Sequence, residues 1–134
     1  MTLIDTNILL DLVTASPDWY EWSLARLDDA ALVGRLVIND VVYAETSIRY
    51  DRIEDFDAML AGTMIDIAPM PRSALFLAGK TYGRYRTVGG TRTGVLPDFF
   101  IGAHAAVEGW PLLTRDTRRY RTYFPNVTLI APAA

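Results

Sequence analysis

The sequence has 134 residues, of which 51% are hydrophobic, so we expect one compact domain that spans residues 1–134 and has its own core. It contains no cysteine, which excludes disulfide bonds and thiolate metal sites. No apolar run reaches about 18 residues, and the N-terminus lacks the pattern of a secretory signal. We therefore expect a cytoplasmic protein without a membrane span.

The net charge of −3 hides an uneven distribution of charge along the chain. Residues 1–70 carry 13 acidic and 4 basic side chains, whereas residues 71–134 carry 3 acidic and 9 basic ones. Phosphates respond to local patches of charge rather than to the total, so a mildly acidic chain can still bind a polyanion. On charge alone, arginines that merely solvate helix faces are the simpler explanation.

In chain order, the patterns predict a strand followed by two helices, three times over, and then a strand, a helix and a strand. Short apolar runs bounded by polar residues indicate the strands, and helical periodicity between breakers such as Pro17 and Gly62 indicates the helices. The expected elements cover about residues 2–5, 7–13, 18–30, 36–38, 39–50, 51–60, 65–68, 71–85, 97–108, 112–114, 116–120 and 127–130. Residues 87–94, rich in glycine and threonine, are expected to form a loop. This alternation predicts an α/β fold with a parallel sheet of about five short strands, covered by helices on both faces.

Two acidic residues stand at the ends of predicted strands. Asp5 ends the first strand, and Asp116 follows the fourth, whose Thr114 is also near the end. In open α/β sheets, ligands bind in the crevice at the carboxyl ends of the strands. An acid in such a position is also a common helix cap, so each of the two has a structural explanation when taken alone.

Two further carboxylates lie on predicted helices. Glu45 shares a helix face with Val41, Val42 and Ile48, which places it in the stripe expected to be buried, where an unpaired charge is costly. Asp98 falls in the first turn of a mostly apolar helix, and the helix dipole alone accounts for its charge. Glu45 is therefore harder to explain without a functional partner than Asp98.

Taken together, the four carboxylates indicate a site for a hard cation. Acidic side chains brought close together repel one another and raise their own pKa values, and a divalent cation offsets that repulsion. Oxygen ligands without cysteine or a histidine pair favour Mg²⁺ or Mn²⁺ over zinc. Such ions polarise phosphoryl oxygens and activate water, so an acidic crevice beside a basic flank suits phosphodiester hydrolysis. Spacing along the chain does not by itself show that the four acids meet.

Four motifs resemble those of PIN-domain ribonucleases, in particular the VapC-type toxins of bacterial toxin–antitoxin pairs. Residues 3–10 (LIDTNILL), 42–45 (VYAE), 97–105 (PDFFIGAHA) and 112–116 (LLTRD) are similar to the family's four acidic motifs in order and spacing. The resemblance covers essentially the whole chain, and the ordered set is specific although each motif alone is weak. Relatives often have phenylalanine after the last acid, and we expect Tyr120 or Phe124 to take that packing position.

The resemblance implies a role for each acid. Asp5, Glu45 and Asp98 would be the primary ligands of Mg²⁺ or Mn²⁺, and Asp116 would support a second ion or orient the first ligands. The implied reaction is the hydrolysis of RNA to a 5′-phosphate and a 3′-hydroxyl. The implied partners are a small antitoxin protein that neutralises the enzyme and a second copy of the chain in a homodimer.

Other residues would support this site. Asn7 and Thr114 are candidates to hold carboxylates and water in place, although capping and strand-end packing explain them equally well. Trp19 and Trp22 lie on a helix that either packs into the core or forms part of a groove for the antitoxin. The candidates for contact with the RNA backbone are Arg84, Arg86, Arg92, Arg115, Arg118 and Arg119.

Two other functions compete with the nuclease. A haloacid-dehalogenase-like phosphatase also starts with a strand-end aspartate, but it needs a second acid where this chain has Asn7 and a lysine near the end, whereas the only lysine is Lys80. A catalytically silent module that binds RNA or a protein partner would not need intact acids. His104 lies on the far side of its helix from Asp98, so we expect it to pack rather than to act as a base.

Overall fold

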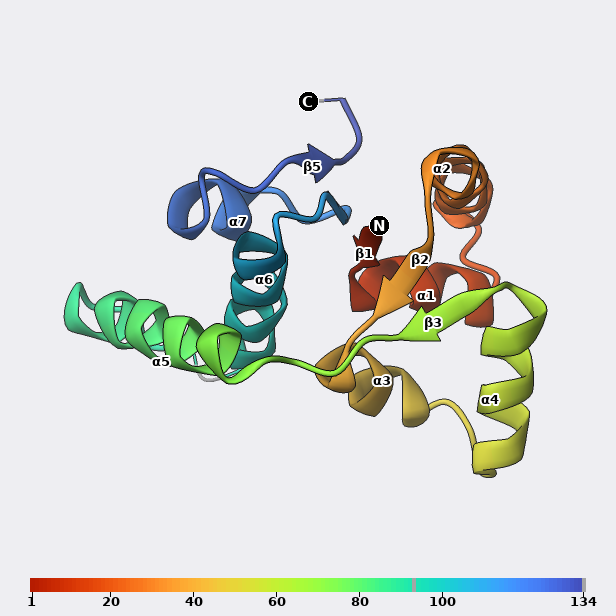
Figure 1. The fold of residues 1–134 in the computed structure, drawn as a ribbon, viewed down its shortest axis with the longest axis horizontal. Helices are drawn as coiled ribbons and strands as arrows, with labels where there is room; N and C mark the ends of the chain where they lie inside the picture. The colour runs from red at the N-terminus through yellow and green to blue at the C-terminus, as the bar shows by residue number, and fades with distance from the viewer. Residues whose placement is uncertain (93, 134) are drawn as a thin grey trace.

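In the computed structural model, which describes residues 1–92 and 94–133, every predicted strand and helix is present (Figure 1). The strands are β1 (Thr2–Ile4), β2 (Leu36–Ile38), β3 (Ile65–Ile67), β4 (Leu112–Leu113) and β5 (Leu129–Ile130). The helices are α1 (Thr6–Val13), α2 (Tyr20–Val33), α3 (Asp40–Ser47), α4 (Ile53–Gly62), α5 (Arg72–Thr87), α6 (Leu96–Glu108) and α7 (Arg118–Tyr123). Of the loop predicted at residues 87–94, Thr93 lies outside the described residues.

Two of the helix boundaries that differ from the predictions do so for local reasons. After Ser47 the backbone continues in tighter turns, because the amides of Arg49 and Tyr50 each donate to the carbonyl three residues back. The last helix starts two residues later than predicted, because the Asp116 amide donates to Thr114 Oγ1 at 3.0 Å and so shapes a turn ahead of α7.

All five strands of the sheet are parallel, and β1 lies at its centre in the order β3-β2-β1-β4-β5. Leu3 pairs with Leu112 and Ile4 with Leu113, so Asp5 and Thr114 follow the two central strands at the same edge. The chain proceeds from β1 toward β3 and then crosses back to β4 and β5. The reversal between β1 and β4 is the place where open α/β sheets bind their ligands.

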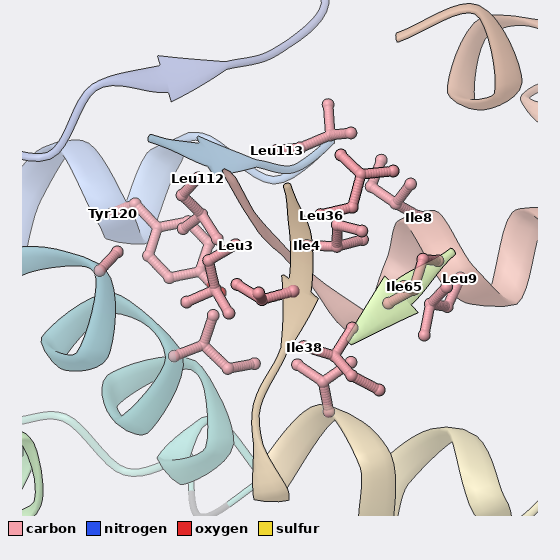
Figure 2. Packing of buried hydrophobic residues seen from close by; sticks show 14 of the residues in the cluster. Leu3, Ile4, Ile8, Leu9, Leu36, Ile38, Ile65, Leu112, Leu113 and Tyr120 are labelled. Atoms are coloured by element: carbon pink, nitrogen blue, oxygen red, sulfur yellow. The ribbon is translucent and has the colours of Figure 1, made fainter. Parts of the chain in front are cut away.

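Helices and loops cover both faces of the central strands, as predicted. Leu3 and Ile4 point to opposite faces of β1, because side chains alternate along a strand, and both are fully buried. In Figure 2, Tyr120 lies to one side of the strands, whereas Ile8 and Leu9 of α1 lie to the other. A sheet covered on both faces needs continuous apolar strands, which explains why these strands do not alternate with polar residues.

The helices form two groups beside the sheet. In the view of Figure 1, α5, α6 and α7 lie to the left of the strands, and α2 and α4 lie to the right. Aromatic rings join α5 and α6 to α7, with Tyr82, Tyr85 and Tyr123 all packed around Phe99. Within the described residues, no helix combines the length and the apolar character needed to cross a membrane.

Candidate active site

Asp5 follows β1 directly, caps α1 and is only 3% exposed. Its Oδ1 accepts a hydrogen bond from the Thr6 amide at 2.7 Å. Its Oδ2 accepts from Thr114 Oγ1 at 2.7 Å, from Tyr120 OH at 2.9 Å and from Asn7 Nδ2 at 3.3 Å. This carboxylate is therefore fixed from three directions: by the start of α1, by the end of β4 and by α7.

Burial dominates the electrostatics of Asp5. It raises the pKa of the Asp5 carboxyl above its usual range, and nearby Glu45 adds to the shift, while the hydrogen bonds from Thr114, Tyr120 and Thr6 oppose it. Burial and the neighbouring carboxylates also raise the pKa of Tyr120 well above the usual value for tyrosine, so its hydroxyl stays protonated and donates to Asp5. The expected packing role of Tyr120 is confirmed by its burial, but its polar contact with Asp5 was not predicted.

Thr6 links Glu45 to Asp5. Its hydroxyl donates to Glu45 Oε1 at 2.6 Å, while its amide donates to Asp5. The expectation that Glu45 lies on a fully buried stripe is wrong, because Glu45 is half-buried and Ile48 is 83% exposed. Since α3 ends at Ser47, Ile48 leaves the helix face that was expected to continue. Sequence reasoning gave Thr6 no role beyond its motif, because spacing does not show which hydroxyl joins two acids.

Asp98 and Asp116 form the other side of the crevice, and Arg119 lies between them. Arg119 Nη1 is 2.5 Å from Asp98 Oδ2 and 3.9 Å from Asp116 Oδ2. The Asp98 side chain, in the first turn of α6, is 28% exposed, whereas that of Asp116 is 49% exposed. Burial raises the pKa of Asp98 to about 6, the charges of Asp5 and Asp116 add to the shift, and Arg119 opposes it. The carboxylates of the two sides are thus close enough to repel one another.

Asn7 joins α1 to the chain that follows β4. Its Nδ2 donates to Asp5, and its Oδ1 accepts from the Arg115 amide at 3.2 Å. The Arg115 side chain turns away to Asp11, donating from Nε and Nη2 at 2.8 and 2.9 Å, and its guanidinium lies 4.9 Å from the Trp19 ring centre. One edge of the Arg115 guanidinium is thus bound by Asp11 and one face packs on Trp19, while its expected contact with RNA stays a prediction. Asp11, a buried acid on a mostly apolar helix, was the missed signal for its contact with Arg115.

The remaining candidate arginines divide into two groups. Arg119 pairs with the carboxylates of the crevice rather than facing solvent. The exposed members, which are Arg84, Arg86, Arg92 and Arg118, lie at the end of α5, after it and at the start of α7. A phosphate backbone can reach these four without breaking an ion pair found within the described residues.

The donor set of the crevice fits a hard divalent cation. Asp5, Glu45, Asp98 and Asp116 offer only oxygen atoms, and the pKa values of Asp5 and Asp98 are raised by burial and, to a smaller extent, by neighbouring carboxylates. As the side chains stand in residues 1–92 and 94–133, however, no group of three or more acids or histidines is close enough to hold an ion. Arg119 compensates the charge of Asp98.

His104 has the packing role that was expected. It is fully buried, its Nδ1 lies 3.2 Å from Asn39 Nδ2, and its ring contacts Trp110 with centroids 5.1 Å apart. Burial lowers the pKa of His104, so the ring is neutral near physiological pH. Its partner Asn39 caps α3, accepting hydrogen bonds from the amides of Val41 and Val42. The histidine therefore supports the start of the helix that carries Glu45.

The fold and the crevice define an α/β domain that gathers carboxylates at the ends of its central parallel strands. The family model described as the PIN domain matches residues 2–125, and the chain belongs to that family. The comparison with curated proteins gives no significant match.

Several solved structures share the fold. VapBC2 from Rickettsia felis, bound to a DNA fragment from its promoter, is similar with a TM-score of 0.74 and 20% identity over 98% of each chain. VapBC-1 from nontypeable Haemophilus influenzae has a TM-score of 0.68 and 17% identity, covering 97% of this chain and 96% of that one. FitAcB from Neisseria gonorrhoeae has a TM-score of 0.67 and 20% identity with the same coverage. At these identities the likeness establishes the fold alone.

Proposed function

We propose that this protein is a metal-dependent endoribonuclease that acts as the toxin of a toxin–antitoxin pair. The observation that carries the proposal is the crevice in which buried Asp5 lies near enough to Glu45 and Asp98 for their charges to interact. Membership of the PIN family and a fold shared with VapBC complexes support the same function. Because the RNA and the antitoxin would both be cytoplasmic, we place the activity in the cytoplasm.

Under this proposal, the residues of the crevice have different roles in hydrolysis. Asp5, Glu45 and Asp98 would hold Mg²⁺ or Mn²⁺, with Asp116 supporting a second ion or orienting these ligands. When bound, the ion supplies positive charge to a phosphoryl oxygen and lowers the pKa of a nucleophilic water. Thr114 keeps Asp5 in position by its hydrogen bond, and Asn7 does so from α1. We expect cleavage to leave a 5′-phosphate and a 3′-hydroxyl.

The first prediction tests the acids. Asp5→Asn and Glu45→Gln should each slow cleavage of a labelled single-stranded RNA by about 100-fold or more, because they weaken the site that stabilises the transition-state charge. Both should also lose most of the heat of Mn²⁺ binding in calorimetry, while circular dichroism shows an intact fold. Asp18→Asn, which changes an exposed acid before α2, is the matched control and should behave as wild type. Wild-type cleavage by Asp5→Asn, or cleavage that persists in excess EDTA, would contradict the proposal.

A catalytically silent RNA-binding module is the second candidate, and one observation favours it. Arg119 forms an ion pair with the Asp98 carboxylate. Among the described residues, no three acids lie close enough together to hold a metal ion. Under this alternative, purified wild-type protein binds RNA in the presence of Mn²⁺ and leaves it uncut. Cleavage that Mn²⁺ restores after EDTA treatment would exclude this candidate.

A surface away from the crevice is a candidate for binding a protein partner. A cavity of about 870 Å³ lies between α2, α4 and β3, and its lining includes apolar Leu24, Leu27 and Met64. Its charged lining residues are Asp28 and the ion pair of Arg35 with Asp66. We propose that an apolar segment of the antitoxin binds there and that its C-terminal segment lies across the active-site crevice. The lining involves later turns of α2 than the tryptophan pair that was expected to contribute.

The second prediction concerns assembly. Three large apolar side chains on or beside α3, α4 and α5 offer exposed apolar surface: Ile48 is 83% exposed, Ile53 62% and Phe76 68%. We propose that part of this surface is buried in a homodimer. Light scattering at micromolar concentration should therefore give twice the chain mass. A monomer at this concentration would contradict the proposal.

A further inference from the structure

A second cavity adjoins the carboxylate crevice, between the end of α5, Arg92 and α7; we call it the α5–α7 cavity. Its volume is about 460 Å³, within the range of about 300–1,000 Å³ found for small-ligand sites. Its lining combines two aromatic rings, three arginines and one carboxylate, from Tyr85, Tyr123, Arg92, Arg118, Arg119 and Asp116. Arg119 and Asp116 belong to both the cavity and the crevice. A charged ligand bound in one of them therefore changes the electrostatic environment of the other.

The aromatic wall of the α5–α7 cavity is held in place by packing. The Tyr85 ring lies 5.4 Å from the Phe99 ring and 5.9 Å from the Tyr123 ring, measured between centroids. Gly90 approaches the Tyr85 ring so closely that a Cβ at this position would overlap it. The Tyr85 hydroxyl accepts a hydrogen bond from the Arg92 amide at 3.2 Å. The wall and the backbone of Arg92 are thus positioned before any ligand binds.

The charges in the α5–α7 cavity favour an anion. Arg92 and Arg118 are exposed, and neither forms an ion pair with any residue of 1–92 or 94–133. Three guanidinium groups face a single carboxylate, that of Asp116. A guanidinium donates two parallel hydrogen bonds to a phosphate, and an adjacent aromatic ring provides a surface on which a base can stack. A nucleotide phosphate is therefore the anion that this lining matches.

Arg119 connects the α5–α7 cavity to the acids. Its guanidinium contacts Asp98 in the crevice at 2.5 Å, yet the same side chain lines the cavity. A divalent cation at Asp98 would repel this guanidinium, whereas a phosphate in the cavity would attract it. Arg119 therefore has two competing partners: the Asp98 carboxylate that it contacts, and an anion bound in the cavity that it lines.

We propose that the α5–α7 cavity binds a backbone phosphate of the RNA substrate, and that Arg119 then exchanges Asp98 for this phosphate and leaves the carboxylates to the divalent cation. The inference rests on the proposed nuclease function, because only a cation-dependent enzyme needs Asp98 to be freed from Arg119 so that its carboxylate can bind the cation. Phosphate and cation then bind with positive cooperativity, and by linkage each raises the affinity for the other by the same factor.

The test uses calorimetry on the full chain with two probes, Mn²⁺ and adenosine 5′-monophosphate, separately and together. Adenosine and inorganic phosphate, titrated in parallel, separate recognition of the phosphate from recognition of the base. The variants are Arg118→Ala and Arg119→Gln, with Arg72→Ala as the control. Arg72 is an exposed arginine at the opposite end of α5, 13 residues and roughly 20 Å along the helix from Tyr85.

Arg119→Gln should shift the two affinities in opposite directions. Without nucleotide it should bind Mn²⁺ about fivefold more tightly than wild type, because Asp98 is no longer occupied, and it should bind the nucleotide about fivefold more weakly. Saturating nucleotide should raise Mn²⁺ affinity in the wild type and not in Arg119→Gln. Arg118→Ala should weaken only the binding of the nucleotide, and Arg72→Ala should change neither affinity. A variant that merely damages the structure would lose both affinities.

The outcomes separate this inference from the proposed function. Weaker or unchanged Mn²⁺ binding by Arg119→Gln, or coupling of the same size as in wild type, overturns the exchange. Wild-type protein that binds Mn²⁺ but neither the nucleotide nor phosphate overturns the cavity assignment and leaves the nuclease function standing. Wild-type protein that binds no Mn²⁺ contradicts the nuclease function and the exchange together.

Discussion

Asp5 and Asp98 stand on two sides of one crevice and are held in opposite ways. Asp5 is almost fully buried, and four hydrogen-bond donors from α1, β4 and α7 surround its carboxylate. Asp98 is 28% exposed, and within the described residues its carboxylate contacts one donor, the guanidinium of Arg119. The first acid is fixed by the sheet, whereas the second is held by a long side chain that can move.

This difference separates two requirements of a cation site. A ligand set by the end of a central strand keeps its place whether or not an ion is present, which removes the cost of ordering it during binding. A ligand paired with an arginine keeps its charge compensated in the ion-free protein. Asp5, which is fixed at the end of β1, thus defines where the ion would bind. The pairing of Asp98 with Arg119 would determine when the site is free to receive the ion.

The largest effect should come from breaking the fixed side. Thr114→Val removes the hydroxyl that donates to Asp5 at 2.7 Å while keeping the shape of the side chain. Loss of a residue that orients a metal ligand typically costs about 10- to 100-fold in metal affinity or activity, and we expect that range for Mn²⁺ binding and for RNA cleavage. Thr128→Val, at an exposed position before β5, is the matched control. Wild-type Mn²⁺ affinity in Thr114→Val would show that Asp5 does not need this donor.

A smaller effect, with a defined pH dependence, should come from the adjustable side. The pKa of Asp98 is about 6 in the folded protein against 3.8 for an unperturbed aspartate, so the folded state binds more protons than the unfolded state between these values. Ionisation of Asp98 therefore lowers the stability of the metal-free protein as the pH rises from about 4 to above 6. The full shift corresponds to about 3 kcal/mol, and solvent access to the side chain reduces this to on the order of 1 kcal/mol.

Asp98→Asn removes this titration and so provides the measurement. In EDTA, the free energy of unfolding of Asp98→Asn should rise relative to that of wild type as the pH rises from about 4.5 to 7.5, with most of the rise between about pH 4.5 and 6. Urea unfolding across this range measures the difference. Asp18→Asn, which changes an exposed acid, controls for general charge effects. Parallel stability curves for wild type and Asp98→Asn would contradict the view that Asp98 is crowded by other acids.

The smallest effect should come from the arginines beyond the crevice. Arg84→Gln combined with Arg86→Gln should weaken RNA binding a few-fold and reduce its salt dependence by about one unit of slope for each lost phosphate contact. Fluorescence anisotropy with a labelled oligonucleotide, between about 50 and 200 mM salt, measures that slope. The control pair, Arg49→Gln with Arg52→Gln, changes exposed arginines in the acidic half of the chain. An equal change of slope in both pairs would show that the basic end of α5 makes no specific contact.

The sequence predicted the fold class, each element and the strand-end position of Asp5, because these depend on local periodicity and on the pairing of short apolar strands. It also pointed to Thr114 and Asn7, since both belong to recognisable motifs. Contacts between side chains of different motifs could not be predicted from the sequence. The bond from Tyr120 to Asp5 and the pairing of Arg119 with Asp98 depend on side-chain conformations that no spacing rule specifies.

The same limit explains the error at Glu45 and the unpredicted contact of Arg115 with Asp11. The buried stripe around Glu45 was extended one turn too far, because the tight turns after Ser47 leave no signal in hydrophobic periodicity. Arg115 was grouped with the other arginines by charge, although its charge is neutralised by Asp11, 104 residues earlier in the chain. Charge counts along a sequence therefore overestimate the basic surface available to RNA.

The hydrogen bonds of Asp5 also bear on how the protein is made. The Thr114 and Tyr120 hydroxyls that hold Asp5 come from residues 109 and 115 positions later in the chain. β1 is synthesised before its neighbour β4, which follows it by more than 100 residues in the chain. Contacts of such long range form late and slowly during folding. A nascent chain therefore carries Asp5 long before the two hydroxyls that hold its carboxylate have been synthesised.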